Sequence, residues 1–392
     1  MVSAPDAATF RNLSEKHYER TVSLRRQLHT HPELSWQEHL TARLVADTLS
    51  AMDIEVYTGI AGTGVVGILR CAEPDSRCVA LRADMDALPI QENNAAAYKS
   101  VVQGVMHACG HDVHTANLLA TASILASLRH SLTGTFKFIF QPSEEQLPSG
   151  ADAMIKAGVL QNPNVEKIIA LHVSPELETG TYGFCPGNFM ASSDEVYITV
   201  IGKGGHAARV EELKNPLLIA AEILLELRMF TDLQRPSVLS FGKMEGAGST
   251  NIVPDRVSLA GTLRCFDEAW RRQTKNHIEN ICHEITDKYL TGCEVHFREG
   301  APVLVNDPAL TSTAMRLAAA YSGSGQVLQL PYRMGSEDFA HYTHHVPGLF
   351  YRIGTGNKKK GITAGLHTPD FDVDETCLLH SPGLMAWLAC NL

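Results

Sequence analysis

The sequence predicts an α/β protein into which a second, smaller α+β domain is inserted. Over residues 1–190, helical patterns alternate with short apolar runs rich in β-branched and aromatic residues, as in a sheet covered by helices on both faces. Over residues 193–300 the expected order becomes β-α-β-β-α-β, that of a ferredoxin-like sheet. A chain of 392 residues is also long for a single core.

The first domain is expected to begin with residues 1–188 and to be completed by residues 302–392. Apolar residues recur with helical spacing at three places, 15–29, 39–52 and 114–128. Buried strands are expected over 64–70, 78–84, 134–140, 167–173 and 348–354.

The inserted domain is expected over residues 189–301. Its strands are predicted over 194–202, 236–246, 256–264 and 293–299, and its helices over 215–230 and 267–290. In the second helix one stripe carries Ile278, Ile281, Ile285 and Tyr289. A sheet of this kind leaves two edges and one face open, which favours a homodimer formed through this domain.

Composition excludes several functional classes. The net charge of −10 argues against nucleic acid as a partner, because binding phosphates requires a basic surface. The sequence contains neither a basic amphipathic stretch nor an apolar run of about 18 residues, so it gives no indication of membrane binding. The first residues lack the pattern of a signal peptide. Nine scattered cysteines without a CxxC pair indicate reduced thiols and a cytoplasmic location.

The segment MHACGHDVHTA, residues 106–116, concentrates side chains that bind metals. Imidazole and thiolate are good ligands for borderline-soft cations, so Cys109 and His111 are candidates. Simpler interpretations stay open. Cys109 alone reads as a buried thiol, and His107 and His114 as structural residues or hydrogen-bond partners of a ligand.

Further polar side chains stand at the ends of predicted strands, where ligands bind in open α/β sheets. Asp84 and Asp86 follow one strand, Glu144 and Glu145 follow the next, and His172 ends a third. Asp84 could merely cap a turn, and the two glutamates could form a solvated loop. However, a strand end is a poor place for two carboxylates unless cations are near.

Nine motifs, in order along nearly the whole chain, carry a family resemblance: RADMDALPI, MHACGHDVHTA, FQPSEE, LHV, GKGGHAA, NIVPD, GTLRCFD, GSEDFAHY and LHTPDF. With them the chain resembles the amidohydrolase branch of the dinuclear metallo-aminoacylase and carboxypeptidase family. That branch includes hippurate, indole-acetyl-amino-acid and N-acetyl-diaminopimelate hydrolases. The resemblance implies a metallo-aminopeptidase-like catalytic domain and an inserted lid or dimerisation domain.

The resemblance also implies two divalent metal ions per chain. The implied ligands are Cys109, His111, Glu145, His172 and His367. Zinc or manganese is favoured, with cobalt or nickel as alternatives. Arg82 stands where other relatives carry a histidine ligand, so the resemblance implies that Asp84 orients a ligand and does not bind metal.

In the implied mechanism Glu144 is the general base that activates a metal-bound water. Because neighbouring residues at a strand end point to opposite sides, the ligand Glu145 can bind metal while Glu144 faces the substrate. His206 of the inserted domain would contact the developing oxyanion, from its own subunit or a partner's. Taken alone, His206 could equally be a surface histidine. Asn251 is a candidate for the substrate carboxylate or the same oxyanion, and Arg264 is a weaker one.

The expected function is therefore cleavage of the amide bond of N-acyl amino acids. A dipeptidase or carboxypeptidase of the same family is the main alternative. A non-catalytic binding protein on this scaffold and a thiol enzyme with Cys109 as nucleophile are further ones. The segment GGHAARV lacks a proline that many relatives carry, which leaves substrate preference open.

Overall fold

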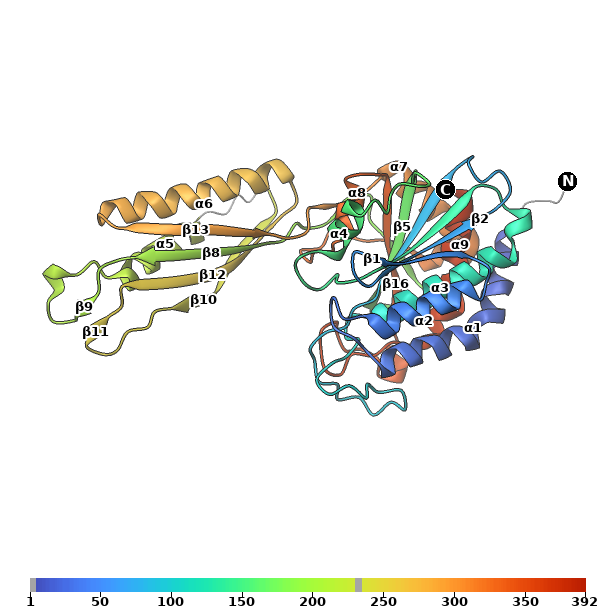
Figure 1. The fold of residues 1–392 in the computed structure, drawn as a ribbon, viewed down its shortest axis with the longest axis horizontal. Helices are drawn as coiled ribbons and strands as arrows, with labels where there is room; N and C mark the ends of the chain where they lie inside the picture. Colours follow the sequence, from blue (N-terminus) through green and yellow to red (C-terminus); the bar gives the residue numbers. More distant parts are fainter. Residues whose placement is uncertain (1–4, 230–234) are drawn as a thin grey trace. The chain divides into compact units, whose positions relative to one another are not determined.

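The structure is a computed structural model that describes residues 5–229 and 235–392 (Figure 1). The chain forms two compact units. The larger contains Met1–Phe189, Val305–Tyr332 and Asp338–Leu392, and the smaller contains Met190–Leu304 and Arg333–Glu337. Residues 333–337, which belong to the smaller unit, lie within the range 302–392 that was expected to belong entirely to the first domain. Phe230, the final residue of a predicted helix, and residues 1–4 lie outside the described residues.

The larger unit is built on an eight-stranded mixed sheet in the order β1-β2-β4-β3-β5-β16-β6-β15. Its strands are β1 (Glu55–Ile60), β2 (Gly64–Arg70), β3 (Cys78–Asp84), β4 (Thr135–Gln141), β5 (Lys167–Glu178), β6 (Tyr182–Phe184), β15 (Val327–Gln329) and β16 (Gly348–Gly356). The four neighbours β4, β3, β5 and β16 run parallel. Their carboxyl ends therefore meet at one edge of the sheet.

Helices cover both faces of this sheet. The main core lies between one face and the helices α1 (Ala7–Thr30), α2 (His39–Ser50), α3 (His111–Ser127), α7 (Pro308–Ser322) and α9 (Ser381–Asn391). On the other face α4 (Gly150–Lys156) and α8 (Ala340–Thr343) pack against each other and against β4 and β16. Alternate residues of the central strands face the two layers, which is why these strands read as unbroken apolar runs.

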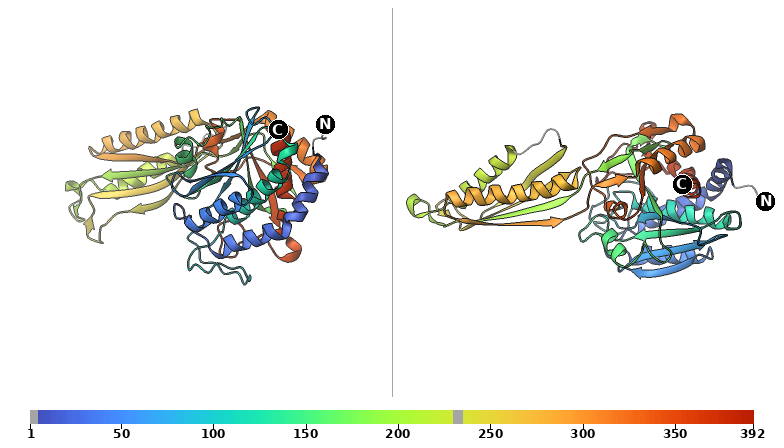
Figure 2. Two further views of the ribbon diagram at one scale, coloured as in Figure 1. Left: turned by 45° about the vertical axis from the view of Figure 1, so that its right-hand side comes forward. Right: turned by 90° about the horizontal axis from the view of Figure 1, so that it is seen from above.

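The smaller unit has a four-stranded sheet in the order β10-β12-β8-β13. Its strands are β8 (Asp194–Ile201), β10 (Ser237–Glu245), β12 (Arg256–Cys265) and β13 (Gly292–Glu299). Helices α5 (Pro216–Met229) and α6 (Glu268–Lys288) cover one face (Figure 2), which gives the predicted β-α-β-β-α-β order. Ile278, Ile281 and Ile285 of the predicted stripe are buried there, whereas Tyr289, just past the end of α6, is partly buried.

Short elements complete the fold. Strands β9 (Gly205–His206) and β11 (Ile252–Val253) pair with each other, as do β7 (Gly187–Met190) and β14 (Leu304–Asn306). Single turns of 3₁₀ helix are η1 (Arg129–Ser131), η2 (Val210–Glu212), η3 (Ser324–Gln326), η4 (Lys358–Lys360) and η5 (Glu375–Leu379). Among the described helices, none combines the length and apolarity that crossing a bilayer requires.

Candidate metal centre

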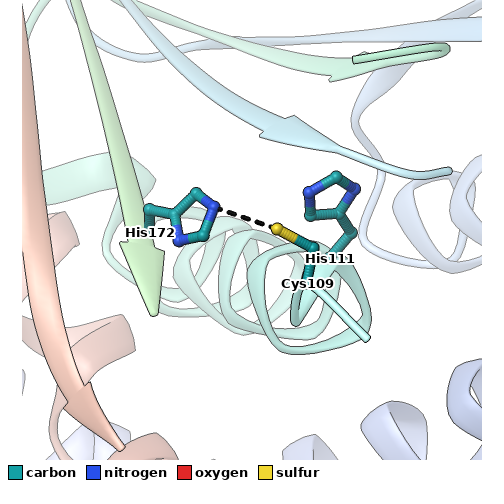
Figure 3. Close-up of side chains that lie close together, drawn as sticks. All are labelled: Cys109, His111 and His172. Carbon is teal, nitrogen blue, oxygen red and sulfur yellow. Dashed lines mark hydrogen bonds between the residues drawn. The ribbon is translucent and has the colours of Figure 1, made fainter. Parts of the chain in front are cut away.

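The loop before α3 places two candidate ligands at the carboxyl edge of the sheet. Gly110 separates Cys109 from His111, the first residue of α3, and has a φ of 82°. A Cβ atom on Gly110 would lie 2.5 Å from Cγ2 of Val173. Glycine is therefore required both for the backbone conformation and for the close approach to β5. This approach brings the Cys109 side chain next to His172 of β5 (Figure 3).

The sulfur of Cys109 lies between two imidazoles. Its distance is 3.4 Å to Nε2 of His172 and 3.3 Å to Nε2 of His367. His367 comes from a distant loop and has a φ of 60°. Its backbone N–H donates to the carbonyl of Ala108 at 2.8 Å, which ties this loop to the one that carries Cys109.

Glu145 and His111 stand on the other side of the cluster. Oε1 of Glu145 lies 3.2 Å from Nε2 of His367 and 3.9 Å from Nε2 of His111. Nε2 of His111 and Oε1 of Glu145 are both buried, and neither makes a well-aligned hydrogen bond with the described residues. Two buried polar atoms of this kind are costly unless something between them is bound. The structure thus brings together all five predicted ligands.

Hydrogen bonds on the far side of two imidazoles prepare them to bind a cation. Nδ1 of His111 lies 2.8 Å from the carbonyl oxygen of Asp86, and Nδ1 of His172 lies 2.8 Å from that of Val173. A carbonyl only accepts, so both Nδ1 atoms carry the proton. In the neutral ring each Nε2 therefore carries the lone pair, and it faces the cluster. This is the arrangement that orients metal-binding histidines, and the donor set fits a borderline-soft divalent cation.

Asp86, which stands with Asp84 at the end of a predicted strand, had no role in the predicted site. Its carboxylate accepts the backbone N–H groups of Glu144 at 3.1 Å and Glu145 at 3.0 Å, and the hydroxyl of Ser35 at 2.7 Å. Burial opposes its charge, but these bonds and His111 lower the pKa of Asp86. It therefore holds the loop with both glutamates against the loop with His111.

The expectation that Glu144 and Glu145 point to opposite sides is wrong. Strand β4 ends at Gln141, and the glutamates lie in the following loop, in which Ser143 has a φ of 46°. The alternation of a strand does not apply there. One oxygen of each glutamate and one ring nitrogen of His111 all lie within 4.8 Å of one another. Oε1 of Glu144 also accepts the backbone N–H of Asp338 at 3.3 Å.

His114 is occupied on both nitrogens. Its Nε2 accepts the backbone N–H of Val173 at 3.0 Å, so Nδ1 carries the proton and donates to Oδ1 of Asp84 at 2.6 Å. This favours the structural interpretation of His114. Asp84 lies 3.7 Å from Nε2 of His111. Burial opposes the charge of Asp84, but His111, His114 and Arg82 hold its pKa well below its usual range.

Arg82 connects Asp84 with Asp338 inside the protein. The fully buried guanidinium donates to Oδ2 of Asp84 at 2.7 Å, to Oδ1 of Asp338 at 2.8 Å and to the side-chain carbonyl of Gln141 at 2.9 Å. The other oxygen of Asp338 accepts from Ser149 at 2.8 Å. Sequence analysis missed Asp338, for which the only signal was its place in GSEDFAHY.

Charges in the cluster shift its proton affinities. Burial disfavours protonated His111, but Asp84, Asp86 and Glu145 outweigh burial and raise its pKa to about 10. Burial, together with Glu145 and Glu144, raises the pKa of Cys109 well above its usual range. A thiol held in its neutral form is a poor nucleophile. This argues against the thiol-enzyme alternative, and the sulfur would have to lose the same proton to bind a cation.

His107 lies beside the cluster without joining it. Both ring nitrogens are buried and make no hydrogen bond with the described residues, and burial lowers its pKa to about 4. Its nearest aromatic neighbour is His29, at 6.4 Å between ring centres. The adjacent Asp112 forms buried ion pairs with Arg25 at 2.7 Å and with His29 at 2.8 Å. These contacts fix the first turn of α3.

The remaining candidates belong to the smaller unit. His206 and Asn251 are exposed and meet at the β9–β11 pair, where the carbonyl of Asn251 accepts the N–H of Ala207 at 2.9 Å. Nδ1 of His206 accepts the N–H of Ala208 at 3.2 Å. A guanidinium nitrogen of Arg264 lies 2.5 Å from the hydroxyl of Ser336.

Comparisons with known proteins agree with this geometry. A sequence model described as Peptidase family M20/M25/M40 matches residues 80–381. The chain is 38% identical to thermostable carboxypeptidase 2 of Saccharolobus solfataricus over 364 residues, 91% of each chain. It is 36% identical to an N-acetylcysteine deacetylase of Bacillus subtilis over 376 residues, 94% of this chain and 96% of the relative.

A solved structure extends the likeness to the arrangement of the chain. The Bacillus subtilis YxeP protein, described as a dinuclear metal binding peptidase from the M20 family, superposes with a TM-score of 0.84. Its sequence is 34% identical, and the match covers 96% of this chain and 98% of that one.

Proposed function

Because the chain belongs to peptidase family M20/M25/M40, we propose that it hydrolyses the amide bond of N-acyl amino acids at a pair of divalent metal ions. The observation that carries the proposal is the convergence of one thiol, three imidazoles and one carboxylate at the carboxyl edge of the sheet. The relative named as an N-acetylcysteine deacetylase supports this substrate class.

The proposed metal ligands are Cys109, His111, Glu145, His172 and His367. Mixed sulfur, nitrogen and oxygen donors favour zinc or manganese, with cobalt or nickel as alternatives. When bound, two such ions would lower the pKa of a water molecule toward neutrality and polarise the substrate carbonyl.

Glu144 is the proposed general base. Its carboxylate would accept a proton from the attacking water and return it to the leaving amine. The N–H of Asp338 holds one of its oxygens, which limits rotation of the carboxylate. Asp84 acts through His114 and His111 and is a positioning residue in this scheme.

Two exposed residues of the smaller unit complete the proposal. His206 would donate to the developing oxyanion, and Asn251 would bind the substrate carboxylate or the same oxyanion. His206 ends β9, and Asn251 directly precedes its partner strand β11, so a single movement of this segment would displace both.

We further propose a cytoplasmic homodimer. Helix α5 exposes Leu218 by 67% and Leu225 by 63%, and residues seven apart share one helix face. An apolar face of this kind favours contact with a second copy. All nine cysteines are free thiols, as expected in a reducing compartment.

A second candidate function is cleavage of short peptides. The relative named as a carboxypeptidase favours it, and the same groups would serve both reactions. Metal-loaded protein should be assayed on matched pairs of substrates that differ only in the acyl group, such as N-acetyl amino acids and dipeptides. A higher kcat/KM on dipeptides would replace the first candidate by the second.

Glu144→Gln and Glu145→Gln, compared side by side, test the mechanism. Glu144→Gln keeps the shape but removes the base, so kcat should fall by roughly 10²–10⁴ with metal content unchanged. Glu145→Gln should lose metal as well as rate. Metal loss in Glu144→Gln alone would mean that the two roles are reversed. Near-normal turnover in Glu144→Gln with full metal would refute the general-base mechanism.

A further inference from the structure

Two cysteines of the smaller unit lie where α6 packs on β13: the hydroxyl of Thr286 donates to the carbonyl of Cys282 at 2.9 Å and lies 3.8 Å from the sulfur of Cys293. Cys282 lies on α6 and is fully buried in the core of that unit. Cys293, the second residue of β13, is half-buried. It packs against the same core as Val295 and Phe297, the next residues on its face of the strand. One thiol is thus enclosed, and its neighbour is open to small solutes.

The sulfur of Cys293 has polar neighbours that stabilise a thiolate. It lies 3.5 Å from Nδ1 of His283 and accepts a contact from the hydroxyl of Thr286 at 3.8 Å. The contact with the Cys282 thiol is the main influence that lowers the pKa of Cys293, and burial is the main influence that opposes it. The same contact raises the pKa of Cys282.

Seven further cysteines are shifted the opposite way, because burial raises the pKa of each. These residues are Cys71, Cys78, Cys109, Cys185, Cys265, Cys377 and Cys390. Cys293 therefore stands out by charge and accessibility together, the two properties that select a cysteine for oxidation.

We propose that Cys293 is an oxidation-sensitive thiol, with Cys282 as its resolving partner and a peroxide as the oxidant. The Cys293 thiolate would attack one oxygen of hydrogen peroxide, forming an S–O bond while the O–O bond breaks and hydroxide leaves as water after protonation. The Cys282 sulfur would then displace the hydroxyl from Cys293, forming the S–S bond and releasing a second water with the Cys282 proton. Two thiols and one peroxide thus give one disulfide and two waters.

The first test follows the products in the full-length protein. After reduction and removal of the reductant, hydrogen peroxide should produce a Cys282–Cys293 disulfide, seen by peptide mass mapping without reductant. In Cys282→Ser, a dimedone adduct should appear on Cys293. Cys265→Ser, which removes a buried thiol of the same unit, should leave the disulfide unchanged. The proposal would be overturned if the wild-type protein formed no Cys282–Cys293 disulfide. It would also be overturned if Cys282 formed a disulfide with a different cysteine in Cys293→Ser.

A second measurement needs no variant and so does not depend on folding of a mutant. The rate of alkylation by iodoacetamide can be followed at Cys293 and at Cys71 in one sample. Both are half-buried, but burial raises the pKa of Cys71 to about 11. The rate at Cys293 should level off below the ordinary thiol pKa of about 8.5, while that at Cys71 still rises. Equal profiles would refute the proposal.

Discussion

Replacing Arg82 by methionine tests how the interior beside the candidate metal centre is neutralised. The side chain has no exposed surface and holds both Asp84 and Asp338. Removing one partner of a buried ion pair costs about 3–5 kcal/mol, because the remaining carboxylates stay buried without a counter-ion. At about 2–4 °C per kcal/mol, typical of a domain of this size, the melting temperature should fall by about 10 °C.

The loss should depend on pH with a definite sign. Burial already raises the pKa of Asp338, and Arg82 holds this rise in check. Without Arg82 the folded-state pKa rises further above the unfolded value. The group then stabilises the fold only while protonated, and this contribution disappears as the pH rises through the folded pKa. The deficit of Arg82→Met should therefore be larger at pH 8 than at pH 5.

Thermal unfolding followed by circular dichroism, with a chelator present, measures this directly. Arg43→Met is the matched control, because Arg43 is 81% exposed and its contact with Asp47 is 3.8 Å long. Such a substitution should change stability by no more than about 0.5 kcal/mol. A melting temperature of Arg82→Met within 2 °C of the wild type at pH 8 would show that the two carboxylates do not need this cation.

Three other predictions concern metal, protons and assembly. Cys109→Ser should lower the metal content of the protein after dialysis. Cys78→Ser should not, because Cys78 begins β3 and so lies at the end of that strand away from the candidate metal centre. Equal metal contents of the two variants in elemental analysis would show that the Cys109 thiol is not part of the site. Because His111 has a pKa of about 10, adding zinc or manganese to chelator-treated protein at pH 7 should release at least one proton, seen with a dye in weakly buffered solution. Metal affinity should fall as the pH is lowered. Metal binding without proton release would contradict the assignment of His111 as a ligand. Leu218→Glu combined with Leu225→Glu on α5 should yield monomers in sedimentation, while Leu40→Glu, 63% exposed on α2, should leave the assembly unchanged; an intact dimer in the double variant would place the interface elsewhere.

Most of the correct predictions came from the apolar stretches that form strands and from the polar residues at their ends. The apolar stretches at β3, β4 and β5 were recognised, and because these strands are parallel their ends had to meet at one edge. That placed His172 near the loops after β3 and β4. What the pattern could not reveal depends on contacts between distant residues. Arg82 and Asp338 are 256 positions apart, and no local signal relates them.

Local backbone conformation was the second feature that the sequence pattern did not reveal. The pleat of a strand was extended past its end to Glu144 and Glu145, although Pro142 and the left-handed backbone of Ser143 end the alternation there. The hydrogen bonds that engage both ring nitrogens of His114 likewise could not be predicted without knowing that β5 runs beside α3. Only then does the N–H of Val173 have an acceptor in this ring.

The carboxylate of Asp86 has a consequence for how this protein can change under selection. It binds the backbone of the proposed base and of the proposed ligand at once, and it faces Nδ1 of His111 at 3.2 Å. A substitution that shifts Asp86 must therefore alter the hold on metal and the placement of the base together. Mutations that improve one of these properties independently of the other should have to arise elsewhere, so adaptation to a new metal or a new substrate is expected to leave this aspartate in place.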